Sequence, residues 1–502
     1  MKSQVVEQID ALFNPASVAV VGASNNPAKW GFGVFNDLVN KGFTGALYPI
    51  TRSEERVSNI PAYSNITEVP GAVDLAIIVV PSQHVPAAMK DCARKGIKSA
   101  VVITAGFREV GGEGVSLEDE VCDIAREAGI RFVGPNCFGM VNTGICLSSM
   151  GLLSPYSMPY VPKGSVAVIS QSGNVGGYLL GLGFQRDLGF SKFVSSGNEA
   201  DLCFEDYIEY LSWDPQTKII VGYVEGLRDG KRFLQIAKET TRNKPIILMK
   251  VGRTKTGSKA AQSHTGSLAG AGSSYEAAFK QAGVICVNEV QELIDVAVAV
   301  AHQPVPKGKR VGIVTNGGGF GVISVDACES LGLEVPSLAP ETIERLSQWL
   351  PPMWSHSNPV DMVGTIDKSY ACIGAVLKDD NVDAVLAISS LGFPAGASLE
   401  GYPKEFREKA LEYARQMEEL ELTKGVIGLI ERMQKHGKPV IAGVGGSMAG
   451  GQEPEAVKAL KRNGIVIHPD PERAARVLRY LAEYGHYLQT LEDGGVDQRD
   501  RL

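Results

Sequence analysis

The stretch Val166-Ala167-Val168-Ile169-Ser170-Gln171-Ser172-Gly173 decides the fold. Its first four residues are apolar on both faces of an extended chain, as in a strand that is buried in a parallel sheet. Serine and glycine follow at once, and a helical segment comes next. Such residues at the carboxyl end of a strand are typical of a turn that can bind an anion. The stretch therefore predicts a strand, a turn and a helix, the start of a βαβ unit.

The same pattern recurs along the chain. Further apolar, β-branched runs alternate with helical stretches, at residues 17–21, 75–80, 99–104, 130–133, 219–224, 245–250, 310–315, 384–389 and 439–444. Helical segments between such runs make parallel sheets that carry helices on both faces. We therefore expect an α/β chain of doubly wound domains.

Two joints rich in proline and lysine divide the chain, at residues 154–164 and 303–309. A chain of 502 residues is also too long for a single core. We expect domains at 1–155, 160–303 and 306–490, followed by a frayed tail at 491–502. The last two domains share a repeat, because Pro162-Lys163-Gly164 and Pro306-Lys307-Gly308 each precede a strand, a glycine turn and a helix.

Composition and charge exclude several classes of protein. The net charge of −7 argues against nucleic acid or an anionic membrane as the main partner, because both would repel the chain. Eight cysteines occur without C-x-x-C spacing, which predicts no disulfide framework, no metal site and a reducing cytoplasm. The N-terminal segment carries acids, and no apolar run reaches the ~18 residues that span a bilayer. We expect a cytoplasmic protein.

The first predicted turn reads Gly22-Ala23-Ser24-Asn25 and leads toward a helix, so it is a candidate site for a phosphate group. The next strand ends at Thr51-Arg52 without the carboxylate that holds the ribose of NAD. Arg52 instead suits a phosphate on the ribose, which leaves NADP or the 3′-phosphate of coenzyme A. A plain turn without a ligand is the remaining alternative.

Other strand ends of the first domain should gather at the same sheet edge. They bring Pro81, Thr104, Ala105 and Asn136, and a long ligand could lie across all of them. Asn136 could bind a ligand or only close an Asx turn.

The second domain has three strand ends with polar residues. Two anion-type turns contain Ser170, Gln171, Ser172 and Gly173, and Ser196, Gly197 and Asn198. Glu225 ends a third strand, where a carboxylate can orient an imidazole or remain a solvated loop residue. His264 lies further on, among small residues that leave its ring uncovered. It could attack and hold a phosphoryl group, or belong to a glycine-rich surface loop.

Six motifs in this order resemble those of the alpha subunit of NDP-forming (ADP-forming) acyl-CoA synthetases, in the succinyl-CoA synthetase superfamily. They are Val20-Val21-Gly22-Ala23-Ser24, Thr104-Ala105-Gly106-Phe107, Gly134-Pro135-Asn136-Cys137, Ser170-Gln171-Ser172-Gly173, Glu225-Gly226 and Ser263-His264-Thr265-Gly266. Asn358-Pro359-Val360-Asp361 resembles the additional domain of the family. The resemblance implies a Rossmann-like CoA-binding domain and two flavodoxin-like domains.

The resemblance also implies a mechanism. Coenzyme A would lie on the first domain, and phosphate would convert acyl-CoA into an acyl phosphate and free CoA. His264 would then take the phosphoryl group, oriented by Glu225, and pass it to ADP. The serine and glycine turns would hold the phosphoryl oxygens.

The family places ADP or ATP, with Mg²⁺, in an ATP-grasp domain, and we find no candidate for one in this sequence. We therefore expect an ATP-grasp beta subunit as partner, and an oligomer. A small monocarboxylate such as acetate is the default acyl group. Two alternatives remain, a non-catalytic CoA- or acyl-CoA-binding protein and an NADP-dependent oxidoreductase.

Overall fold

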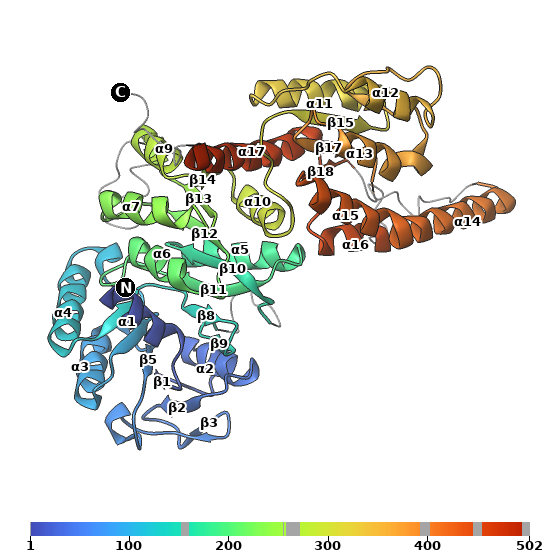
Figure 1. Cartoon of the computed structure of the whole chain (residues 1–502). Coiled ribbons are helices and arrows are strands. Elements are labelled where there is room, and N and C mark those ends of the chain that lie inside the picture. Colours follow the sequence, from blue (N-terminus) through green and yellow to red (C-terminus); the bar gives the residue numbers. More distant parts are fainter. Residues whose placement is uncertain are drawn as a thin grey trace, which may run out of the picture. The chain divides into compact units, whose positions relative to one another are not determined.

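The computed structural model describes residues 2–151, 160–254, 256–257, 272–391, 402–444 and 454–493. The chain divides into two compact units, residues 1–294 and residues 295–502. The first unit contains two large sheets and the second unit contains one, and parallel pairing dominates in all three (Figure 1). The expected α/β architecture of doubly wound sheets is confirmed.

The first sheet has five parallel strands in the order β2-β1-β5-β6-β7. Their bounds are β2 (Ala46–Ile50), β1 (Ser17–Val21), β5 (Leu75–Ile78), β6 (Ser99–Val102) and β7 (Arg131–Val133). The helices are α1 (Gln4–Phe13), α2 (Trp30–Asn40), α3 (Val85–Lys95) and α4 (Glu113–Ala128), and a small hairpin of β3 (Arg56–Val57) and β4 (Ile60–Pro61) follows β2.

Both faces of this sheet are buried, which explains why its strands are apolar throughout. Val18 and Val20 of β1 pack into a cluster with residues of α1 and α2. Ala19, between them, packs into a second cluster with residues of α3 and α4. Successive side chains of a strand point to opposite faces, so each residue of β1 contributes to one of two helix layers.

The second sheet has the order β14-β13-β12-β10-β11-β8-β9. Its strands are β14 (Ile285–Cys286), β13 (Ile246–Lys250), β12 (Ile219–Val224), β10 (Lys163–Ser170), β11 (Phe190–Ser195), β8 (Met140–Asn142) and β9 (Leu147–Ser148). The helices that follow its strands are α5 (Gly173–Gln185), α6 (Phe204–Trp213), α7 (Gly230–Thr240), α9 (Gly272–Gln281) and α10 (Val290–His302).

One edge of the second sheet departs from the expected parallel pattern. β8 pairs antiparallel with β11, and β9 pairs antiparallel with β8. Both short strands lie inside the predicted first domain, residues 1–155, although they complete the second sheet. The three-domain division therefore stays a prediction, and strand pairing ties residues 140–148 of the predicted first domain to the second sheet.

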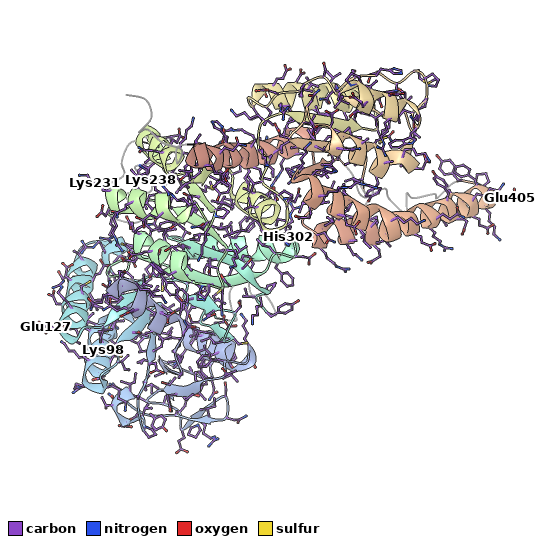
Figure 2. The ribbon with its side chains drawn as sticks, in the orientation of Figure 1. Lys98, Glu127, Lys231, Lys238, His302 and Glu405 are labelled. Carbon is purple, nitrogen blue, oxygen red and sulfur yellow. The ribbon has the colours of Figure 1, made fainter. Side chains whose placement is uncertain are left out.

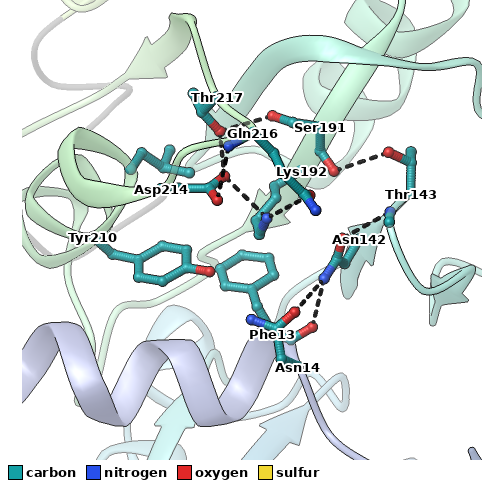
Figure 3. A network of polar contacts seen from close by, with 12 residues as sticks. Phe13, Asn14, Asn142, Thr143, Ser191, Lys192, Tyr210, Asp214, Gln216 and Thr217 are labelled. Carbon is teal, nitrogen blue, oxygen red and sulfur yellow. Dashed lines mark hydrogen bonds and ion pairs between the residues drawn. The ribbon is translucent and has the colours of Figure 1, made fainter.

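Polar side chains also join α1 to the second sheet (Figure 3). The side-chain amide of Asn142 donates to the carbonyl oxygen of Phe13 and to Asn14 Oδ1, at 2.9 Å in each case. Close by, the buried Lys192 Nζ lies 3.0 Å from Asp214 Oδ2. Such groups are tolerated in a core only when their hydrogen bonds are satisfied, as they are here.

The second unit contains the third sheet, all parallel, in the order β16-β15-β17-β18-β19. Its strands are β16 (Val360–Asp361), β15 (Val311–Thr315), β17 (Ala384–Ile388), β18 (Val440–Gly443) and β19 (Ile467–His468). Its helices are α11 (Gly318–Ser330), α12 (Pro340–Ser347), α13 (Ser369–Lys378), α14 (Lys404–Leu420), α15 (Val426–His436), α16 (Glu455–Arg462) and α17 (Pro471–Asp493). Asn358 holds β15 in place, because its side chain accepts from Ile313 N–H and donates to Val311 O.

Charged side chains lie on the outside of the helices, as Glu127 of α4 and Lys231 of α7 illustrate (Figure 2). Among the described residues, no helix is long and apolar enough to cross a membrane. All eight cysteines are free thiols.

Candidate active site

A cavity of about 960 Å³ lies within the first unit. From the first sheet, the predicted CoA-binding residues that line it are Gly22, Ala23, Ser24, Arg52, Pro81, Thr104, Ala105 and Asn136. From the second sheet, the predicted phosphate-binding residues that line it are Gln171, Ser172, Gly173, Gly197 and Asn198. Residues more than 100 positions apart in the sequence thus face one space. The strand ends of the first domain were expected to gather at one sheet edge, and the shared cavity with the second sheet was not predicted.

The remaining predicted residues lie outside this lining. Asn25, Ser170, Ser196 and Glu225 are described and do not line the cavity. His264 lies outside the described residues. The roles of all these residues as ligands or catalysts stay predictions.

The turn after β1 approaches its neighbours very closely. Gly22 has φ +99°, and a Cβ atom on it would lie 2.5 Å from the carbonyl oxygen of Val79. A Cβ atom on Gly31, in the first turn of α2, would lie 1.9 Å from the carbonyl oxygen of Gly22. Both positions therefore need glycine, and the start of α2 is pressed against the turn. As a result Lys29, Trp30 and Gly31 line the cavity beside the turn.

A carboxylate of the chain itself occupies several donors of this turn. Ser24 Oγ donates to Glu54 Oε1 at 2.9 Å, and the backbone N–H of Asn25 donates to the same oxygen at 3.0 Å. The hydrogen bond from Asn25 N–H lowers the pKa of Glu54 below its usual value, and Ser24 adds to this effect. Asn25 also holds the following hairpin, because its Oδ1 accepts from Ser58 N–H at 3.1 Å.

These contacts change what the first turn can do. Ser24 and Asn25 anchor the loop that carries Arg52, and their expected contact with CoA stays a prediction. The sequence analysis found no acid at the end of β2, although Glu54 follows Arg52 by two residues. An acid just beyond a strand end was the signal that could have identified it.

The end of β6 meets the turn that carries Asn136. The backbone N–H of Asn136 donates to Thr104 O at 2.8 Å, and Thr104 Oγ1 donates to Val80 O at 2.7 Å. Asn136 Nδ2 donates to Asn198 Oδ1 at 3.2 Å. Asn136 therefore connects the cavity wall of the first sheet with that of the second.

On the second sheet, the first turn of α5 faces the cavity. Ser172 caps this helix, Ser170 Oγ donates to Ser172 O at 2.5 Å, and Ser170 itself is fully buried. Gly173 and Asn174 line the cavity at the helix N-terminus, where free backbone N–H groups and the helix dipole favour an anion. Ser170 shapes the turn from below, and the main chain of α5 presents the donors.

Gln171 acts as a clamp between two strand ends. Its Oε1 accepts from the backbone N–H groups of Glu225 and Gly226, and its Nε2 donates to Gly226 O at 2.8 Å. These bonds hold the amide against the end of β12, and its expected contact with phosphate stays a prediction. Gln171 therefore fixes the segment that carries Glu225.

Glu225 itself is 5% exposed, and a lysine lies beside it. Lys250, at the end of β13, donates from Nζ to Glu225 O at 2.8 Å and lies over the ring of Tyr275. Burial lowers the pKa of Lys250, and the charge of Glu225 opposes that shift. The sequence analysis passed over this lysine because it reads as the last residue of an ordinary strand.

The turn after β11 packs on the turn before β8. A Cβ atom on Gly197, which has φ +61°, would lie 2.3 Å from Pro135 O, so no side chain fits there. Asn198 Nδ2 donates to Glu109 Oε2 at 2.6 Å and to Glu118 Oε2 at 2.9 Å. Burial raises the pKa of Glu109, but hydrogen bonds from Asn198 and Gly106 outweigh it and bring the pKa below its usual value.

Comparison with known proteins assigns different domains to the two sheets of the first unit. Family models match a CoA binding domain at residues 16–143, a succinyl-CoA ligase like flavodoxin domain at 163–300 and a ligase-CoA domain at 311–391. The acetate–CoA ligase [ADP-forming] II subunit alpha of Pyrococcus furiosus is 42% identical over 478 residues, 95% of this chain and 97% of that protein. The chain belongs to the ADP-forming acetate–CoA ligase family.

One further relative and one solved structure are also similar to the chain. The acetate–CoA ligase [ADP-forming] I of Archaeoglobus fulgidus is 37% identical over 95% of this chain, which covers only 64% of that longer protein. A solved structure is also similar, the dinucleotide forming acetyl-coenzyme A synthetase 1 of Ca. Korarchaeum cryptofilum in complex with phosphate and ADP. It has a TM-score of 0.82 and 34% identity, covering 98% of this chain and 99% of that one. The expected Rossmann-like and flavodoxin-like folds are confirmed, and the NADP alternative is set aside.

The described residues contain no group of three or more His, Cys, Asp or Glu side chains that could hold a metal ion.

Proposed function

We propose that this chain is the catalytic alpha subunit of an ADP-forming acyl-CoA synthetase. It interconverts acyl-CoA, phosphate and ADP with carboxylic acid, CoA and ATP. One observation carries the proposal, namely the cavity in which the strand ends of the first sheet face the N-terminus of α5. A CoA derivative that lies along the first sheet would bring its thioester to the anion-binding end of α5.

The chemistry then proceeds in three transfers. A phosphate oxygen attacks the thioester carbonyl, the C–S bond breaks, and CoA leaves as the thiolate. An imidazole nitrogen of His264 attacks the phosphorus of the acyl phosphate, and the carboxylate leaves. The phosphoryl group passes finally from His264 to ADP. Covalent relay divides one difficult transfer into easier ones.

We assign the residues of the second sheet two kinds of role. The backbone N–H groups of Gly173 and the turn at Gly197 bind phosphate oxygens, supported by their place on the cavity wall. The side chains of Ser170, Gln171, Ser196 and Asn198 hold these turns in shape, supported by the hydrogen bonds described above. Glu225 orients His264 by accepting a hydrogen bond from its ring.

The nucleotide is held mainly by a partner, an ATP-grasp beta subunit, in an oligomer. The longer Archaeoglobus fulgidus relative supports this, because about a third of it has no counterpart in this chain. ADP or ATP with Mg²⁺ would bind there. A cytoplasmic location agrees with the eight free thiols.

The purified chain should be incubated with radiolabelled phosphate and a panel of acyl-CoAs, beside His264→Ala. We expect acid-labile, base-stable label on the wild type and none on the variant. His486→Ala is the matched control, because His486 is exposed and lies in the second unit. Label on His264→Ala would refute the relay through this residue. If CoA binds and no label appears even with an ATP-grasp subunit added, the chain is a CoA-binding protein instead.

A further inference from the structure

Glu199 directly follows the phosphate-facing turn of Ser196, Gly197 and Asn198, and its carboxyl group folds back beneath that turn. The residue is 5% exposed and has φ +55°, an unusual conformation for a side chain of this size. The turn is closed twice. Glu199 N–H donates to Ser196 O at 3.3 Å, and Ser196 Oγ donates to Glu199 Oε1 at 2.7 Å.

The carboxyl group also reaches the neighbouring strand ends. Gln171 forms a side-chain hydrogen bond with it. Gln171 in turn clamps Gly226, whose N–H donates to Gln171 Oε1 at 3.0 Å. Glu199 is therefore the acidic group shared by the two side chains that hold the ends of β11 and β12.

The charges around Glu199 oppose one another. Burial raises its pKa, and Glu205 at the start of α6 adds to this effect, whereas Ser196, Gln171 and the guanidinium of Arg228 lower the pKa. The net result is a pKa of about 7. Arg228 is held close because its Nη2 donates to Asn198 O at 3.0 Å. The hydroxyl of Tyr207 on α6 also interacts with the charge of Glu199, and it has no hydrogen-bond partner among the described residues.

We propose that Glu199 is a positioning residue of the phosphoryl-transfer site, and that the charge of its carboxyl group sets how firmly Ser196 and Gln171 hold the two turns. This inference rests on the function proposed above. The ionised carboxylate accepts hydrogen bonds from both side chains. The protonated carboxyl has one O–H that must donate, and the Ser196 hydroxyl oxygen, 2.7 Å from Glu199 Oε1, is placed to accept it.

Protonation therefore removes one of the acceptors that Ser196 and Gln171 use, and the clamp on Gly226 loosens. We expect His264 phosphorylation to slow by ~tenfold as the pH falls through 7, since a hydrogen bond to a charged group is lost. CoA binding should keep its affinity across the same range, because Glu199 does not line the cavity.

The test is the pH profile of phosphate incorporation from acyl-CoA into Glu199→Gln, between pH 6 and 8. Glutamine has the same shape and does not ionise, so the profile should lose its step near neutral pH. Glu292→Gln is the matched control, because Glu292 is fully buried at the start of α10 and outside the cavity lining. It should keep the wild-type profile.

A Glu199→Gln protein that keeps the step would overturn the inference. If Glu199→Gln does not fold, Glu199→Asp keeps the charge with a shorter reach, and its step should move along the pH axis; an unmoved step would also overturn it. Failure of the proposed function gives a different result, namely no label on the wild type at any pH.

Discussion

Arg52 offers a direct test of how coenzyme A is recognised. The side chain is exposed and lines the cavity two residues after β2, on the loop that Glu54 ties to the turn after β1. We expect Arg52→Gln to weaken the binding of CoA because a charge-assisted hydrogen bond to the 3′-phosphate is lost. Such bonds contribute about 1.5–3 kcal/mol. Since Arg52 is exposed and screened by salt, the lower value applies, which corresponds to ~10-fold in Kd.

The assay is isothermal titration of wild type and Arg52→Gln with CoA and with dephospho-CoA, which lacks the 3′-phosphate. The variant should lose affinity for CoA and bind dephospho-CoA as the wild type does. Arg56→Gln is the matched control, since Arg56 is exposed on the same loop and does not line the cavity. If Arg52→Gln weakens both ligands equally, the reasoning about the 3′-phosphate is refuted.

Three further perturbations follow from the packing of the first unit. Lys192→Met should lower the free energy of unfolding by ~3–5 kcal/mol, because Asp214 stays buried without its cation. The double variant Lys192→Met, Asp214→Leu should recover much of this loss. Urea denaturation measures both variants, and a loss below ~1 kcal/mol for Lys192→Met alone would contradict the prediction. Gly31→Ala should force α2 away from Gly22, lower the free energy of unfolding by ~1–3 kcal/mol and weaken the binding of CoA. An unchanged affinity in a titration with CoA would contradict the close approach of the two glycines. Glu199 has a pKa of about 7 in place of 4.5, so the folded protein keeps its proton longer than the unfolded chain does. The free energy of unfolding of the wild type, relative to that of Glu199→Gln, should therefore fall by ~3 kcal/mol as the pH rises from 4.5 to 7, and stay constant above pH 7. If the unfolding free energies of the two proteins change in parallel with pH, the raised pKa of Glu199 is excluded.

Much of the fold could be predicted because its strands are simple. β1 and β12 were expected with the bounds that the structure has, since each is an unbroken apolar run covered on both faces. β11 was not expected, because Ser191 and Lys192 interrupt its apolar pattern. Their burial depends on Asp214 and Thr217, which lie more than 20 positions further along the chain.

The cavity could be predicted in part, and the hydrogen bonds around it could not. Strand ends of one parallel sheet converge by a topological rule, so the strand-end residues of the first domain were expected at one edge. That the second sheet contributes to the same cavity was not predicted. Glu54 and Glu109 reach their partners across 30 and 89 positions of sequence, and no local pattern encodes such pairs. Ser24, Asn25 and Gln171 hold the loops around the cavity through such hydrogen bonds, and their expected contacts with ligands stay predictions.

The two sheets of the first unit share one apolar cluster, which runs from Val6 to Val284, and β8 and β9 belong to the second sheet although they directly follow the first one in the sequence. The CoA-binding segment is thus not an independent module. A gene fragment that ends near residue 150 would leave β8 without β11 and expose the apolar side of α1, which normally packs on Tyr210. Transplanting this segment into another protein would require the whole of residues 1–294, so the CoA site and the phosphate turns are inherited together.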